Sequence, residues 1–183
     1  MTRLGAIFAG GQARRFGGDK ASATLEGVAL LDHVARRLAG QCDELVVVGR
    51  EWPGLRTIGD LPSSGLGPLG ALAGALDFAA RRGHGEILTS GCDLPDLPLD
   101  LADRLFPAPA VADGQPLLGL WPAEFAPRLI AWLEADRDRS MRAWIAETRA
   151  RTVALPVHPS NINRPTDLET LALRLSEDRR SSR

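Results

Sequence analysis

LGAIFAGGQARRFGGDKAS, residues 4–22, is the stretch that decides the fold. Its apolar run, residues 4–8, predicts a short buried strand, and residues 9–20 predict a Gly-rich loop. The basic side chains of this loop are Arg14, Arg15 and Lys20. Glycines let backbone N–H groups approach a ligand closely, and the basic side chains add positive charge. The stretch therefore indicates an anion site after the first strand, with a solvated Gly-rich turn as the alternative interpretation.

Strand and helix patterns alternate along the chain, with short connections. Further strands are predicted at residues 45–48, 55–60, 86–93, 115–121 and 151–156. Helices are predicted at residues 30–40, 68–82, 95–106, 123–135, 140–148 and 166–175. This alternation is typical of a mostly parallel sheet with helices on both faces.

The chain shows no internal repeat or linker, so we expect one domain over residues 1–175. Ser140 is expected to cap the helix that follows it, and Thr166 with Glu169 has the spacing of a capping box. Residues 176–183 are rich in charge and serine, and they predict a flexible, solvated C-terminal tail.

Composition narrows the function class. The 183 residues are 44% hydrophobic and 25% charged, with a net charge of −1, which argues against nucleic acid as a main partner. Cys42 and Cys92 lie outside any CxxC pattern, so neither a disulfide framework nor a zinc site is expected. The sequence has no apolar stretch long enough to span a bilayer and no signal peptide pattern. We expect a cytoplasmic protein with no membrane partner.

Two carboxylates, Asp60 and Asp93, come at the ends of predicted strands. In a parallel sheet, ligands bind beyond the carboxyl ends of the strands, so both side chains are expected on the same edge. Carboxylates there suit Mg²⁺, which takes one or two of them together with phosphate oxygens. Asp93 is the stronger candidate because SGCDLP forms a strand-to-turn corner. The alternative is that each Asp caps the next turn.

Three further sequence patterns resemble known ligand-binding motifs and need a structural interpretation. Asn161 and Asn163 in NINRP follow the last predicted strand and suit a metal or a phosphate, or else an Asx-turn. A Walker A loop is excluded because Asp19, not Gly, precedes Lys20, and its carboxylate would repel phosphate. A G-x-G-x-x-G match at Gly65, Gly67 and Gly70 follows a long loop instead of the first strand. There we expect Gly67 to give loop flexibility and Gly70 to allow close helix packing.

Taken together, these pieces resemble one family. FAGGQARRFGGDK (residues 8–20) is similar to the nucleotidyltransferase signature L-A-G-G-x-x-x-R-M-G-x-D-K, and GPLGAL, CDLP and NINRP follow in the order that the signature's family uses. The resemblance is to the molybdenum cofactor guanylyltransferase (MobA) family and spans nearly the whole chain. It implies a single Rossmann-like three-layer α/β/α domain with a mostly parallel mixed sheet, of the nucleotide-diphospho-sugar transferase type.

The resemblance also implies a reaction: transfer of GMP from GTP to the terminal phosphate of molybdopterin (molybdenum) cofactor, with release of pyrophosphate. By carry-over, the guanine and phosphate site is lined by Phe8, Ala9, Gly10 and Gly11. Lys20 would contact the phosphates, Asp60 would lie on the nucleotide side, and Asp93 would hold Mg²⁺. The acceptor side would carry Asn161 and Asn163. The attacking phosphate oxygen is already ionised, so catalysis needs positioning and charge neutralisation, by Mg²⁺, Lys20 and Arg15.

The sequence departs from the family pattern at three places. Phe16 replaces a Met, Val48-Gly49-Arg50 stands where the family often has an Asn near the guanine, and Arg164 replaces the Thr of N-x-N-T-P. Alternatives therefore stay open: a transferase that uses another base or acceptor (cytidylyl or sugar-phosphate), a non-catalytic nucleotide-binding regulator or assembly partner, and an NAD(P)-binding domain. The partners expected from the resemblance are GTP, the molybdenum cofactor and other cofactor-assembly proteins.

Overall fold

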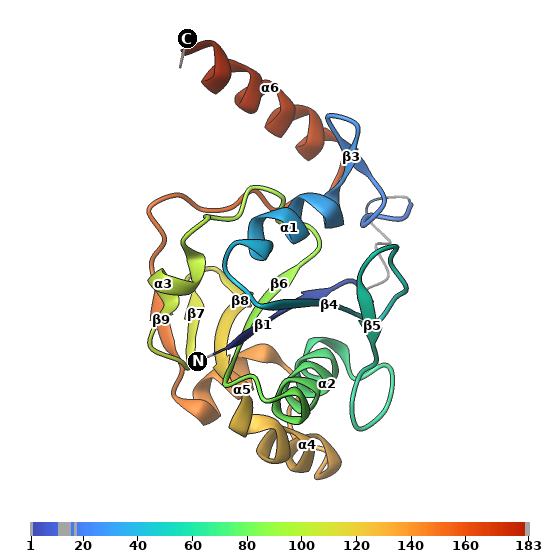
Figure 1. The fold of residues 1–183 in the computed structure, drawn as a ribbon, viewed down its shortest axis with the longest axis vertical. Helices are drawn as coiled ribbons and strands as arrows, with labels where there is room; N and C mark the ends of the chain where they lie inside the picture. The colour runs from blue at the N-terminus through green and yellow to red at the C-terminus, as the bar shows by residue number, and fades with distance from the viewer. Residues whose placement is uncertain (1, 11–15, 17, 182–183) are drawn as a thin grey trace.

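A seven-stranded sheet forms the centre of the computed structural model, which describes residues 2–10, 16 and 18–181 (Figure 1). The strands run in the order β5-β4-β1-β6-β8-β7-β9. Their bounds are β1 Arg3–Phe8, β4 Glu44–Val48, β5 Arg56–Ile58, β6 Glu86–Gly91, β7 Ala110–Ala112, β8 Gln115–Pro122 and β9 Arg151–Val153. Outside this sheet, β2 (Thr24–Leu25) and β3 (Val28–Ala29) form a short antiparallel hairpin.

The sheet is mixed and mostly parallel, as predicted. Strands β5, β4, β1 and β6 are parallel neighbours, so Phe8, Val48 and Gly91 lie in register at one edge. Strand β8 is antiparallel to both β6 and β7, and β9 is parallel to β7. The carboxyl ends of the four parallel strands therefore meet at one edge, which is where this class of sheet binds its ligands.

Helices cover both faces of the sheet, which gives three layers (Figure 1). Their bounds are α1 Leu30–Ala39, α2 Gly67–Arg82, α3 Leu101–Leu105, η1 Ala123–Phe125, α4 Ala126–Glu134, α5 Met141–Thr148 and α6 Pro165–Ser181. Helices α1 and α3 pack on one face, and α2, α4 and α5 pack on the other. The predicted single α/β/α architecture is confirmed.

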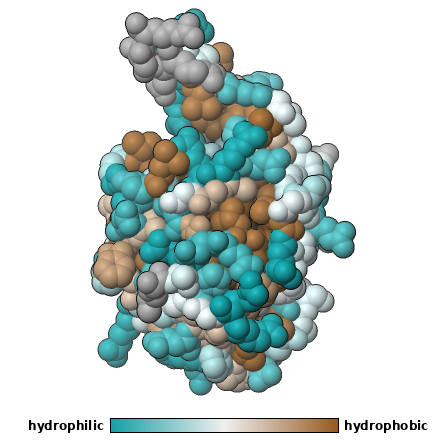
Figure 2. Space-filling view, in the orientation of Figure 1, coloured by the Kyte–Doolittle hydropathy of each residue, from teal (hydrophilic) through white to brown (hydrophobic). Residues whose placement is uncertain are grey.

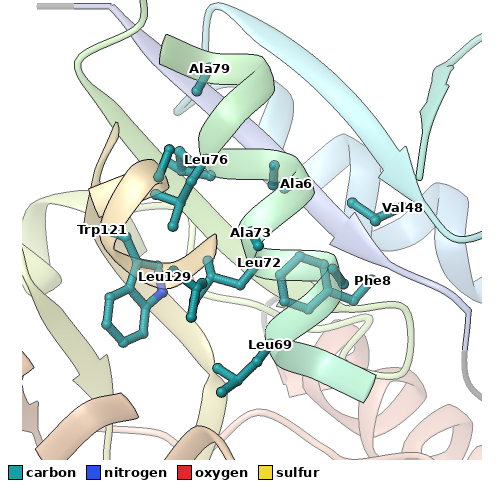
Figure 3. Packing of buried hydrophobic residues seen from close by; sticks show 14 of the residues in the cluster. Ala6, Phe8, Val48, Leu69, Leu72, Ala73, Leu76, Ala79, Trp121 and Leu129 are labelled. Atoms are coloured by element: carbon teal, nitrogen blue, oxygen red, sulfur yellow. The ribbon is translucent and has the colours of Figure 1, made fainter. Parts of the chain in front are cut away.

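The alternation of side chains along β1 explains the two cores. Leu4, Ala6 and Phe8 point into the cluster that α2 covers, whereas Ile7 and Ala9 point into the cluster that α1 and α3 cover. Successive residues of a strand face opposite sides, so a strand buried on both faces is apolar throughout. Figure 3 shows the α2 side, where Phe8 and Ala6 face the leucines of the helix and Trp121 and Leu129 close the cluster.

Most predicted elements are found, with different bounds. Ser140 caps α5 as predicted, since its Oγ accepts the Ala143 N–H at 3.1 Å. The last strand ends at Val153, earlier than predicted. Strand β7 and the β2–β3 hairpin are not predicted from the sequence, because each is only two or three residues long and local periodicity needs a longer run.

Helix α6 differs from its prediction at both ends. Its N-terminus is capped by Asp167, whose Oδ2 accepts the N–H groups of Asn163 and Arg164 at 2.7 Å each, in place of the predicted Thr166–Glu169 box. The helix also continues past residue 175 to Ser181, where the sequence predicts a tail. Leu171 of this helix and Ile162, which precedes it, pack against Leu25 of the β2–β3 hairpin, and the far end of the helix points away from the sheet (Figure 1).

The surface in this orientation mixes polar and apolar side chains. Figure 2 shows hydrophobic patches along α6 and across the middle of this face, bordered by hydrophilic residues. Within the described residues, no helix has both the length and the apolar character needed to cross a membrane.

Helix α2 approaches the end of β5 closely because it carries glycine where the two meet. A Cβ on Gly74 would lie 2.1 Å from the carbonyl oxygen of Gly59, and a Cβ on Gly70 would lie 3.3 Å from the Cβ of Asp60. The Leu61 N–H also donates to the Gly70 carbonyl at 3.1 Å. Glycine inside a helix costs about 1 kcal/mol relative to alanine, so this contact offsets a propensity penalty. The close packing expected of Gly70 is confirmed.

We predict that Gly74→Ala destabilises the protein by about 1–3 kcal/mol, because the added methyl group forces α2 away from Gly59. Gly40→Ala is the matched control: an added Cβ there meets no atom within 4 Å, so its effect should stay within about 0.5 kcal/mol. Urea unfolding of both variants measures the difference. Equal midpoints for the two variants would contradict the packing argument.

Candidate functional site

A cavity of about 1260 Å³ opens at the carboxyl ends of the four parallel strands. Each of these strands contributes the residues that directly follow it. The charged side chains along its wall are Asp19, Lys20, Arg50, Glu51, Asp60 and Asp93. The first turn of α2 also lines it through Gly67 and Pro68, so the positive end of a helix dipole faces the cavity. Such a space, with both signs of charge and a helix N-terminus, suits a phosphorylated ligand.

Lys20 lies at the centre of the polar wall. Its Nζ donates to Asp93 Oδ2 at 2.8 Å and to Asn163 Oδ1 at 2.9 Å. The side chains of Lys20 and Asp93 are 14% and 23% exposed, so water screens this pair less than a surface ion pair. An ammonium has three N–H groups, and two of them bind these described residues.

The end of β6 places Asp93 for this contact. A Cβ at Gly91 would lie 2.5 Å from Asp93 Oδ1, so the carboxylate folds back over a position that only glycine leaves free. The chain here is tied to β1, because the Cys92 N–H donates to the Phe8 carbonyl at 3.2 Å. The strand-to-turn corner predicted from SGCDLP therefore holds the Asp93 carboxylate in a defined position.

The segment before α6, residues 160–164, carries Asn163 to the same place. The Ile162 N–H donates to the Asp93 carbonyl at 3.0 Å, and the Ile162 side chain is fully buried. At the start of this segment, the Ser160 N–H donates to Asp96 Oδ1 at 2.7 Å. At its end, the Asn163 N–H donates to Asp167 Oδ2 at 2.7 Å. These backbone contacts hold Asn163 beside Asp93 although 70 residues separate the two in the sequence.

Asn161 is placed differently from Asn163. It lines a second, smaller cavity of about 260 Å³ beside α6, together with Asp167, Thr170 and Arg174. Among the residues the structure describes, only Asn163 of the two contributes to the main cavity. The sequence predicts the two asparagines as one group, but the structure separates them.

The start of the Gly-rich loop meets the end of β4 through a close backbone contact at Gly10. A Cβ on Gly49 would lie 2.7 Å from Gly10 Cα, and Gly49 has a φ of +88°, a conformation that favours glycine. The Ala9 N–H donates to the Val48 carbonyl at 3.0 Å beside this contact. In the sequence, Gly49 was noted only as part of a departure from the family pattern and was not assigned to the site, although a single glycine after an apolar strand is a signal of such a contact.

Phe8, Ala9, Gly10 and Asp60, which the sequence assigns to the nucleotide side, all line the main cavity. Asp60 lies against the first turn of α2, beside Gly70. Gly11 and Arg15 lie outside the described residues, so the structure does not place them. Among the described residues, the site candidates from the Gly-rich loop and from the ends of β5 and β6 therefore line the same cavity.

Asp19, the carboxylate that precedes Lys20, is paired with Arg50. Arg50 binds it with two hydrogen bonds, Nη1 to Oδ1 at 2.5 Å and Nη2 to Oδ2 at 2.7 Å. The hydrogen bond from Arg50, followed by one from the Ser22 hydroxyl, holds the pKa of Asp19 well below its usual range. Arg50 also lies over the Trp52 ring, 5.4 Å from its centroid. Sequence reasoning missed this pair, which joins two loops.

The cavity offers few groups for acid–base or covalent chemistry. Among its described lining residues there is no histidine, and His33 and His84 bond to Leu25 and Glu44. Burial raises the pKa of the Cys92 thiol to about 11, so it is neutral at neutral pH. The described residues contain no group of three or more His, Cys, Asp or Glu side chains able to hold a metal by themselves. The described side chains of this site can therefore contribute by placing charges around a ligand.

These features define an α/β protein with a charged cavity at its strand ends, and comparison with known proteins gives the family. Residues 5–153 match the model of the MobA-like NTP transferase domain. The chain belongs to this family.

Named relatives cover nearly the whole chain. A molybdenum cofactor guanylyltransferase of Cereibacter sphaeroides is 37% identical over 97% of this chain and 100% of its own length. A molybdenum cofactor guanylyltransferase of Rhodobacter capsulatus is 35% identical over 97% of this chain and 99% of its own length. Both are proteins to which this chain is similar from end to end.

Solved structures share the fold at lower identity. Molybdopterin-guanine dinucleotide biosynthesis protein A from Archaeoglobus fulgidus superposes with a TM-score of 0.71 at 21% identity, covering 95% of this chain and 99% of that one. A 4-diphosphocytidyl-2C-methyl-D-erythritol synthase superposes with a TM-score of 0.67 at 13% identity, covering 96% of this chain and 100% of that one. These likenesses support the nucleotidyltransferase fold.

The Asp19–Arg50 pair makes stability depend on pH. Since pairing lowers the pKa of Asp19 in the folded protein, the stabilisation is fully present above the ordinary carboxyl pKa of about 4 and is lost as the pH falls below it. We predict that Asp19→Asn lowers the free energy of unfolding at pH 7 by at most about 1 kcal/mol, since the pair is partly exposed.

Urea unfolding at pH 7 and at pH 3 should show the gap between wild type and Asp19→Asn narrowing at the lower pH. Asp103→Asn, at an exposed position on α3, is the control and should leave the midpoint unchanged at pH 7. A gap that is the same at both pH values would contradict the role of this pair.

Proposed function

We propose that this protein transfers GMP from GTP to the terminal phosphate of molybdopterin (molybdenum) cofactor and releases pyrophosphate. The observation that carries the proposal is the convergence of Lys20, Asp93 and Asn163 on the wall of one cavity. Support comes from the family of the chain and from relatives named molybdenum cofactor guanylyltransferase at up to 37% identity over nearly full length.

In the proposed reaction, an oxygen of the acceptor's phosphate forms a bond to the α-phosphorus of GTP, and the bond from that phosphorus to the pyrophosphate oxygen breaks. The attacking oxygen is ionised at neutral pH, so no general base is needed. A cavity without histidine among its described lining residues agrees with this. The barrier is the approach of one anion to another, and positioning with charge neutralisation lowers it.

Lys20 is proposed to donate to a phosphate oxygen and to neutralise charge as it develops. Phe8, Ala9, Gly10 and Gly11 are proposed to line the guanine and phosphate site, with Asp60 on the nucleotide side. Arg15 is proposed as a second cation near the phosphates. Asn163, which lies beside Lys20, is proposed to face the acceptor, with Asn161 on the outer side of the same corner.

The residues present fit Mg²⁺. The Asp93 carboxylate and the Asn163 amide oxygen are hard oxygen ligands, and Mg²⁺ in proteins takes one or two carboxylates and completes its shell with water and substrate phosphates. We propose that these two residues hold Mg²⁺ when it is bound with GTP, where it neutralises charge on the transferring phosphate. The absence of a larger acidic cluster among the described residues agrees with a site that phosphates complete.

We predict that Asp93→Asn and Lys20→Met each lower pyrophosphate release from GTP and molybdenum cofactor by about 10²–10³-fold, because each removes one charge-stabilising contact. Asp103→Asn is the matched control for the loss of a carboxylate and should keep full turnover. A coupled pyrophosphate assay measures the rates, and circular dichroism checks that the variants fold. Turnover that survives both substitutions would refute the proposed roles.

Two alternatives are separated in the same assay. The fold is shared with a protein named for a cytidyl product, so the fold alone does not select the base. Turnover with CTP and none with GTP would favour the cytidylyl alternative. Tight GTP binding without pyrophosphate release from any acceptor would favour a nucleotide-binding regulator.

A further inference from the structure

Lys20 is the only lysine in the chain. All the other side chains among the 22 that are Lys or Arg are arginines. An ammonium is a compact charge whose three donors can turn toward several oxygens, whereas a guanidinium is a planar fork. The one place where the chain uses the compact cation is against Asp93 and Asn163, and this points to a role that depends on its size.

The two oxygens that hold the ammonium are the two that suit a divalent cation. Asp93 Oδ2 lies 2.8 Å and Asn163 Oδ1 lies 2.9 Å from the same nitrogen. One is a carboxylate oxygen and the other an amide oxygen, which are both ligand types that Mg²⁺ and Ca²⁺ use in proteins. In the ligand-free protein, Lys20 therefore occupies the oxygens that a metal ion would need.

The backbone that carries these two oxygens is held by contacts that do not involve Lys20. The Asp93 carbonyl accepts the Ile162 N–H at 3.0 Å, and Asp167 holds the backbone of Asn163 at 2.7 Å. Gly91 leaves the space into which Asp93 folds. The two oxygens can thus remain together after the ammonium leaves them.

We propose that Lys20 acts as a resident cation that excludes divalent metal ions from the free protein and gives up Asp93 and Asn163 when a nucleoside triphosphate enters the cavity. An ammonium within a few ångströms of a dication repels it, and an oxygen pair with one carboxylate compensates for this poorly. Triphosphate oxygens reverse the balance, because they attract Lys20 and add anionic ligands. Metal and nucleotide then bind cooperatively. This inference rests on the proposed function only for the identity of the anion.

Mn²⁺ binding without any nucleotide tests the inference, with free Mn²⁺ followed by electron paramagnetic resonance. Lys20→Met keeps most of the length of the side chain and removes its charge. We expect this variant to bind Mn²⁺ at least about tenfold more tightly than wild type. The Lys20→Met, Asp93→Asn double variant should lose that gain, because the gained site needs the carboxylate. Lys20→Gln is a second variant with the same expectation.

Arg104→Met, at an exposed position of helix α3 that does not line the cavity, removes one positive charge and should not change Mn²⁺ binding. Equal affinity in wild type and both Lys20 variants would overturn the inference, and so would a gain that persists in the double variant. The experiment contains no GTP and no acceptor. It can therefore succeed while the turnover assay fails, or fail while turnover is observed, and the two proposals are judged separately.

Discussion

The contact of one ammonium with two oxygens, Lys20 with Asp93 and Asn163, is the constraint on which the cavity depends. Its three residues come from the Gly-rich loop, the end of β6 and the segment before α6. Because the Lys20–Asp93 ion pair is partly buried, water and salt screen it weakly, and its strength depends on the distance between the two groups. Each of the three segments therefore has to be held in place by its own contacts. The fold does this with backbone: glycines at Gly91 and Gly49 and a carboxylate cap at Asp167.

The fold could be predicted because its signals are local. An apolar run with strand length, followed by helical spacing, identifies β1, β4 and β6 and the helices between them, and parallel neighbours place their ends together. Strand β7 escaped prediction because Ala110–Ala112 is too short to show a period. The extension of α6 to Ser181 escaped because charged and serine-rich residues resemble a tail when they are considered without their helical neighbours.

The candidate site was predictable to the extent that strand ends determine it. Asp93 directly follows a predicted strand and Lys20 lies in the loop after the first one, so their meeting at one edge is consistent with the parallel sheet. Contacts between loops left no such signal. The Asp19–Arg50 pair joins two loops that are 31 residues apart, and the Asp167 cap replaces a box that the sequence spacing favoured. The separation of Asn161 from Asn163 depends on where the chain turns into α6, which local pattern does not give.

Because Lys20 is the only lysine, protein labelled with ¹⁵N-lysine reports on it alone. Nuclear magnetic resonance of the labelled side chain is therefore the most direct test of the cavity as a triphosphate site. We predict an ammonium signal that is visible in the ligand-free protein, because Asp93 and Asn163 hold its protons, and that moves when GTP is added. A signal lost to rapid solvent exchange in the free protein, or one that GTP leaves unchanged, would contradict the account.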